Sequence, residues 1–183
     1  MEGDILIAHP LLQDGFFNRS VVYITNHGSV ESLGFVLNFK TDFKLRDVKP
    51  EIKNGNFPIY EGGPVAKDQL FYIHRLGNDL SDSVKIKDDI YFGGDFYELM
   101  HLIEHGKVKT YDVRFFAGYS GWAEGQLDAE IKKKHWLINK NVESGFFGNE
   151  AEDLWRLQLS EIKNTYSIVF SFFKINICHI NIN

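Results

Sequence analysis

The spacing that looks most like catalytic chemistry is His101-Leu-Ile-Glu104-His105. It has the order of a zinc-hydrolase motif, in which two histidines four residues apart bind the metal and the glutamate acts as a base. The helix expected around it argues against zinc, because its apolar residues define a buried face and leave both histidines towards solvent. A catalytic zinc needs a third protein ligand and a dry cavity. We therefore predict no metal site and no bound cofactor.

A serine, a histidine and an aspartate near the start of the chain have the residue types of a hydrolase triad. They are Ser20, His27 and Asp14. Ser20 lacks the G-x-S-x-G turn that exposes a nucleophile. We expect Ser20 to open a strand and His27 to end it, so a direct hydrogen bond between them is not expected. Serine-hydrolase chemistry is accordingly not favoured.

The segment Gly62-Gly63-Pro64 could bring backbone N–H groups close to a phosphate. Neither a P-loop nor a dinucleotide-binding pattern accompanies it, and Pro64 removes one donor. The composition therefore favours a tight turn.

The densest polar and aromatic segment covers residues 118–131. We interpret its glycines around Tyr119 and Trp122 as a tight strand-to-helix turn with the rings folded over it. On the following helix Gln126 and Glu130 are four residues apart and share a face. That pair could hold a ligand or close off neighbouring backbone, and we favour the structural role.

Hydrophobic patterning predicts the elements that would position these residues. A strand-rich first half followed by helices predicts an α+β fold. Residues 40–57 are polar and irregular, which indicates a long surface excursion. The helix from Asp95 has Glu98 in capping-box spacing and stops at Gly106. Strands are expected at 5–8, 21–25, 34–38, 69–74 and 113–117, with two short ones within 83–92, and further helices at 123–134 and from Asn149.

Composition sets the class of protein. The chain has 183 residues, of which 44% are hydrophobic and 25% charged, as in an ordinary globular domain. Its formal net charge of −5 does not support nucleic-acid binding, although the basic run Lys132-Lys133-Lys134 keeps nucleic acid open as a partner class. Cys178 is the only cysteine, and no apolar run approaches the ~20 residues of a spanning helix. We expect a cytoplasmic protein without a membrane partner.

Several motifs, taken in order, resemble the YqgE/AlgH family. The resemblance implies an α+β fold with a bifurcated mixed sheet curled into a pseudo-barrel with peripheral helices. Some members carry the label of transcriptional regulator, and the family supplies no catalytic residues to carry over. The matching residues are Leu6-Ile7-Ala8-His9-Pro10, Asp14, Phe17, Ser20-Val21-Val22, His27, Gly34, Val36-Leu37-Asn38, Gly62-Gly63-Pro64-Val65, His74, Gly118-Tyr119-Ser120-Gly121-Trp122, Gly125-Gln126-Leu127, Glu130, Trp136 and Trp155.

We therefore predict a YqgE/AlgH-like domain over residues 1–165 and an atypical tail over 166–183, for which we hypothesise a frameshift near Val169. The expected function is that of a non-enzymatic binding or regulatory protein of unknown biochemical activity, with a protein or small molecule as partner. The alternative is a small-molecule enzyme, such as a hydrolase, that uses Asp14, His27, His74 or Glu130. The candidate ligand-binding residues are Asp14, Ser20, His27, Asn38, Gly62, Gly63, His74, Tyr119, Trp122, Gln126 and Glu130.

Overall fold

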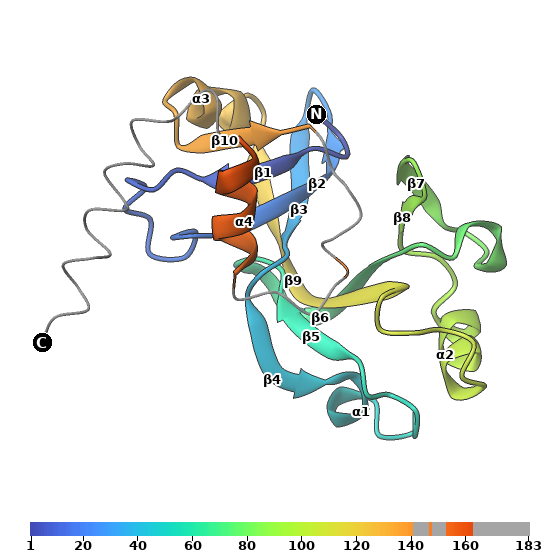
Figure 1. Ribbon diagram of the computed structural model, residues 1–183. Coiled ribbons are helices and arrows are strands. Elements are labelled where there is room, and N and C mark those ends of the chain that lie inside the picture. The colour runs from blue at the N-terminus through green and yellow to red at the C-terminus, as the bar shows by residue number, and fades with distance from the viewer. Residues whose placement is uncertain (141–146, 148–152, 163–183) are drawn as a thin grey trace, which may run out of the picture.

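Ten strands and four α-helices form the part of the chain that the computed structural model describes, residues 1–140, 147 and 153–162 (Figure 1). The expected α+β class is confirmed. The predicted tail at 166–183 and the expected helix start at Asn149 lie outside the described residues. The strands are β1 (Ile5–Ala8), β2 (Val21–His27), β3 (Glu31–Val36), β4 (Lys40–Lys44), β5 (Pro58–Glu61), β6 (Val65–His74), β7 (Val84–Lys87), β8 (Ile90–Phe92), β9 (Val113–Ala123) and β10 (Trp136–Asn139). The helices are α1 (Leu45–Val48), α2 (Phe96–Glu104), α3 (Gln126–Lys132) and α4 (Leu154–Glu161), and η1 (Gly77–Asp79) is a 3₁₀ turn.

The strands form one open, forked sheet. Its main order is β10-β1-β2-β3-β9-β6-β8-β7, and β5 joins β9 as a branch that carries β4. The β5–β9 pairing is parallel, whereas the other pairings are antiparallel. Among the described strands no pairing joins β10 to β7, so the expected curling into a pseudo-barrel is corrected to an open sheet. Lysines on β7 leave that edge charged, which discourages further strand pairing.

A kink in β9 produces the fork. Residues 113–117 pair with β6 on one side and β5 on the other, and residues 120–123 pair with β3. Gly118 lies between these parts at a φ of +73°, and a Cβ there would lie 2.6 Å from the carbonyl oxygen of Val65. Only glycine combines that backbone conformation with so close an approach. The strand-to-helix turn expected at residues 118–122 was therefore wrong: the strand continues to Ala123, and the turn into α3 falls at Gly125.

The surface excursion expected at residues 40–57 was also wrong. This segment holds β4 and α1, and it buries Leu45, Ile52 and Phe57 against α2 and the first half of β9. Its apolar residues are too widely spaced to show a helix or strand period, but the fold gathers them into one core. The expected cap of α2 is confirmed, because the Asp95 side chain accepts a hydrogen bond from the backbone N–H of Glu98.

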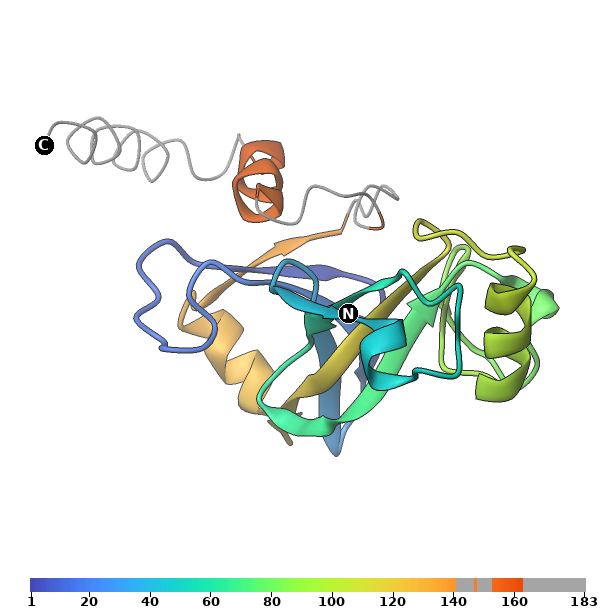
Figure 2. The same cartoon turned by 90° about the horizontal axis from the view of Figure 1, so that it is seen from below.

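Side chains of the first strands alternate between the two faces of the sheet, and a helix covers each face. Ile5 and Ile7 point to the core beneath α4, while Leu6 and Ala8 point to the core beneath α3. Figure 2 shows α3 and α4 on opposite sides of these strands. Leu127 anchors α3 and is 1% exposed. As a result, α3 is held beside the loop that follows β1.

Candidate functional site

One cavity gathers residues from distant parts of the chain. It has a volume of about 790 Å³, and it lies between the loop at residues 9–17, the end of β9, α3 and the start of β10. Its size and its mixture of aromatic and polar groups are those of a small-molecule site. Of the predicted residues, it brings together Asp14, Trp122, Gln126 and Glu130. Its other lining residues include His9, Gln13, Phe17, Ala129, Lys133, Lys134, His135 and Trp136.

Glu130 is the centre of a hydrogen-bond cluster in this cavity. Its Oε2 accepts the indole N–H groups of Trp122 at 2.9 Å and Trp136 at 2.8 Å. Its Oε1 accepts the side-chain amide of Gln126 at 2.9 Å. The carbonyl oxygen of that amide accepts the backbone N–H of Ala123 at 3.0 Å. Both tryptophans are 3% exposed, so Glu130 satisfies two buried donors while it ties α3 to β9 and β10.

Three aromatic rings form one wall of the cavity. Phe17 stacks on Trp122 at 6.1 Å between centroids, and it meets Trp136 edge-on at 5.4 Å. Asp14 fixes the loop that carries this ring, because its Oδ1 accepts the backbone N–H groups of Phe16 and Phe17, both at 2.9 Å. Asp14 therefore shapes the cavity through the backbone.

Cationic groups lie along another part of the same cavity. Lys133 and Lys134 line it beside His135 and His9. Burial is the main cause that lowers the pKa of His9, and the nearby charges of Lys134 and His135 lower it further. Within the described residues, no carboxylate lies at ion-pair distance from either lysine. This part of the cavity thus holds two ammonium groups that form no ion pair with any described carboxylate.

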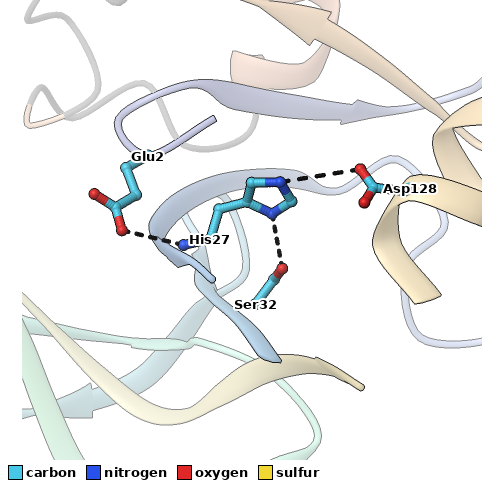
Figure 3. A network of polar contacts seen from close by, with 4 residues as sticks. All are labelled: Glu2, His27, Ser32 and Asp128. Atoms are coloured by element: carbon cyan, nitrogen blue, oxygen red, sulfur yellow. Dashed lines mark hydrogen bonds and ion pairs between the residues drawn. The ribbon is translucent and has the colours of Figure 1, made fainter. Parts of the chain in front are cut away.

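His27 lies beside α3 but does not line the cavity (Figure 3). Its Nδ1 is 2.9 Å from Ser32 Oγ, and its Nε2 is 3.9 Å from Asp128 Oδ1. Its backbone N–H donates to Glu2 Oε1 at 3.3 Å. The residue types resemble a serine-hydrolase triad, but Ser32 is 4% exposed and the distance from the histidine to Asp128 exceeds a hydrogen bond. The network therefore holds β2, β3, α3 and the N-terminus together.

His74 lies in the interior at the end of β6 and is 0% exposed. Its Nδ1 accepts the backbone N–H of Leu76 at 3.1 Å, which leaves Nε2 to donate to the carbonyl oxygen of Gly93 at 2.9 Å. Burial lowers the pKa of His74, and the hydrogen bond to Gly93 partly opposes that shift. His74 is thus a hydrogen-bonded core histidine, away from the cavity.

The depressed pKa of His74 predicts a pH dependence of stability. The unfolded chain takes up this proton near the ordinary value of 6.5, whereas the folded protein resists it. The neutral, buried His74 is therefore expected to make its full contribution to stability above that pH. The free energy of unfolding should fall as the pH drops below it. Urea unfolding between about pH 7.5 and 5.5 measures the slope. The pKa of His9 is also lowered, so His9 contributes to the same slope and both proteins compared carry His9→Asn. Adding His74→Asn should flatten the dependence of stability on pH. An unchanged slope would contradict the role given to His74.

Ser20 and Asn38 serve the start of β2. Ser20 is 0% exposed, and among the described residues its hydroxyl has no hydrogen-bond partner. Asn38 Oδ1 accepts the backbone N–H of Val21 at 2.8 Å, and its amide donates to the carbonyl oxygen of Arg19 at 2.9 Å. Neither residue lines the cavity.

The Gly62-Gly63 turn packs against the backbone of β9. A Cβ on Gly62 would lie 2.3 Å from the carbonyl oxygen of Gly118, and one on Gly63 would lie 2.1 Å from that of Tyr119. Gly62 also accepts a hydrogen bond from Ser120 Oγ at 3.0 Å. Tyr119 is half-buried and meets Phe71 edge-on. This turn fills space against the sheet and leaves its backbone no room for a phosphate.

The arrangement therefore separates the residues that the enzyme alternative would need. Asp14 and Glu130 share the cavity, whereas His27 and His74 lie elsewhere. The predicted ligand-binding residues did not include Phe17, Trp136, Lys133 and Lys134. The available signal was the pair of tryptophans near Glu130, because a buried indole N–H needs an acceptor.

The motif at His101 and His105 lies on the exposed face of α2, as the helix period predicted. Their rings are 4.1 Å apart between centroids, and His105 Nδ1 donates to the backbone carbonyl of His101. Across the described residues, no cluster of three potential metal ligands is found. Nor is any helix there long and apolar enough to cross a membrane.

Comparison with known proteins gives consistent results. The sequence model of a family described as AlgH-like matches residues 5–167. A UPF0301 protein from Parabacteroides distasonis is 42% identical over 168 residues, which cover 91% of this chain and 85% of the relative. A UPF0301 protein from Cytophaga hutchinsonii is 38% identical over 172 residues, covering 93% and 94%.

A solved structure shares the fold. The AlgH protein from Pseudomonas aeruginosa superposes with a TM-score of 0.72 at 24% identity, covering 93% of this chain and 92% of that one. At that identity the likeness shows the fold alone.

Proposed function

The chain belongs to the AlgH-like family, and from that premise we propose that it is a non-enzymatic protein that binds a small organic molecule in the cavity between the 9–17 loop and α3. The names of its UPF0301 relatives assign no activity, so the proposal rests on the cavity. Because the 9–17 loop lines the cavity, a bound ligand would form part of the surface beside that loop, and a regulatory role would require a partner that contacts this surface. The single cysteine suits a reducing compartment, so the proposal places the protein in the cytoplasm.

The state of Glu130 is the observation that carries this proposal. A general base or nucleophile must aim a free oxygen at its substrate. Three of the roughly four acceptor positions of Glu130 are taken by N–H groups, from Gln126 and from two tryptophans. Protonation of Oε2 would weaken the hydrogen bonds of both indole N–H groups, and each tryptophan is 3% exposed. Glu130 therefore supports a walled binding site better than it supports a reaction.

A blocking substitution tests the proposal. Ala129 lines the cavity from the exposed side of α3, so Ala129→Trp should fill it without disturbing the core. Lys132→Trp is the matched control, because it lies on the same helix and does not line the cavity. Thermal-shift screening of the full chain should cover neutral, cationic and anionic metabolites. A ligand at about 100 times its Kd should stabilise the protein by roughly 2.7 kcal/mol.

We expect this stabilisation in the unmodified chain and in Lys132→Trp, and its loss in Ala129→Trp. A shift that persists in Ala129→Trp would place the ligand elsewhere, and no shift with any compound would overturn the binding role.

The enzyme alternative makes a different prediction. A hydrolase would turn over activated esters or phosphoesters, and Asp14→Asn would reduce that rate. We expect no turnover above the uncatalysed rate, because His27 and His74 lie outside the cavity. Saturable turnover that is lost in both Asp14→Asn and Ala129→Trp would establish the enzyme instead.

A further inference from the structure

The geometry points to the chemical class of the ligand: we infer that the cavity takes a small organic anion that carries a flat ring, with a phosphate or carboxylate as its charged group. This inference rests on the proposed binding function. It joins two features of the same cavity, the aromatic wall and the lysines that no described carboxylate neutralises.

The lysines supply the anion-binding part. Lys133 and Lys134 follow directly on α3, and both line the cavity. The carboxylates that share the cavity are Asp14 and Glu130, and each already accepts backbone or side-chain N–H groups. Among the described residues, no carboxylate lies at ion-pair distance from either lysine, so both ammonium groups are available to an anion.

The backbone at Lys134 shows how α3 ends beside the cavity. α3 ends in a Schellman motif, in which the N–H of Lys134 bonds to the carbonyl of Ile131 and the N–H of His135 bonds to that of Glu130. The residue in the Lys134 position adopts the left-handed conformation, here with a φ of +61°. Glycine is the usual residue there, because any other side chain strains the backbone. Lys134 therefore occupies a position at the end of α3 where glycine would cost the backbone less, and its side chain lines the cavity.

The aromatic wall supplies the ring-binding part. Phe17 is partly buried and lines the cavity, and Trp122, which is 3% exposed, supports its ring by stacking against it. Flat rings contact such side chains favourably in offset or edge-on arrangements. Because the wall and the lysines belong to one cavity, a single ligand could engage both.

Four probes separate the two parts of this inference. AMP has a ring and a phosphate, indole-3-acetate has a ring and a carboxylate, adenosine has the ring alone, and inorganic phosphate has the charge alone. Binding to the full chain is measured by titration calorimetry. We expect AMP or indole-3-acetate to bind at least tenfold more tightly than adenosine and inorganic phosphate, and the tighter of the two identifies the charged group.

Substitutions then assign the contacts. Lys134→Gly should weaken binding of the preferred probe at least tenfold while the melting temperature stays the same or rises, because glycine relieves the strained backbone. A merely structural role for Lys134 would not lower affinity in that way. Lys133→Ala should also weaken binding, and Lys132→Ala, which removes the same charge outside the lining, should change affinity less than twofold.

The outcomes separate this inference from the proposed function. If Ala129→Trp abolishes binding of a neutral or cationic ligand that Lys134→Gly leaves intact, the cavity binds ligands but the inferred class is wrong. Failure of all four probes also overturns the inferred class, and the wider screen then decides the binding function. Equal affinity for adenosine and AMP would show that the lysines do not contribute to binding.

Discussion

Glu130→Ala is expected to destabilise the protein by about 3 kcal/mol or more, since it leaves the indole N–H groups of two tryptophans and one amide without their acceptor. Each buried donor that loses its partner costs about 1–3 kcal/mol. Trp122 and Trp136 cannot turn to water without opening the core, because each is 3% exposed. For a chain of this size the loss corresponds to a fall in melting temperature of roughly 6–12 °C.

Glu124→Ala is the matched control. Glu124 is exposed in the turn before α3, and no hydrogen bond or ion pair of its side chain is found among the described residues. Thermal unfolding should show a change of less than about 0.5 kcal/mol for this variant. Tryptophan fluorescence should also change in Glu130→Ala, because two of the chain's three tryptophans lose their acceptor. A loss below about 1 kcal/mol in Glu130→Ala would show that Glu130 does not hold this part of the fold.

Gly63→Ala is expected to be at least as damaging, although it adds a single methyl group. Its Cβ would lie 2.1 Å from the carbonyl carbon and oxygen of Tyr119, and 2.3 Å from the backbone nitrogen of Ser120. These are backbone atoms of the central strand, so no side chain can move aside. We expect a loss of about 3 kcal/mol or more, at the upper end of overpacking effects, measured by urea unfolding.

Gly15→Ala serves as its control. A Cβ at Gly15 meets no atom within 4 Å, and the residue does not have a left-handed backbone. Its stability should change by less than about 1 kcal/mol. If both variants were equally stable, the close approach of the Gly62-Gly63 turn to β9 would not be a feature of the protein. The contrast also tests why this turn has two glycines, which we attribute to packing against the kinked strand.

Features that depend on neighbouring residues could be predicted from the sequence. The cap of α2 at Asp95 and the strand expected at residues 21–25 followed from local patterns, and the structure confirms both. The α+β class followed from the order of such elements. These features are predictable because helix caps, turns and the hydrophobic period each depend on only a few neighbouring residues.

Contacts between distant segments could not be predicted from the sequence and are known only from the tertiary structure. The course of β9 through Gly118 depends on pairing with β3, β5 and β6, and no local pattern distinguishes that kink from a turn into a helix. The cavity likewise joins the 9–17 loop to α3, across more than a hundred residues of chain. Glu130 was identifiable from the sequence as a candidate, but its role depends on two tryptophans that the fold places around it. These contacts are long-range and depend on how the whole chain packs, so the local spacing of residues does not predict them.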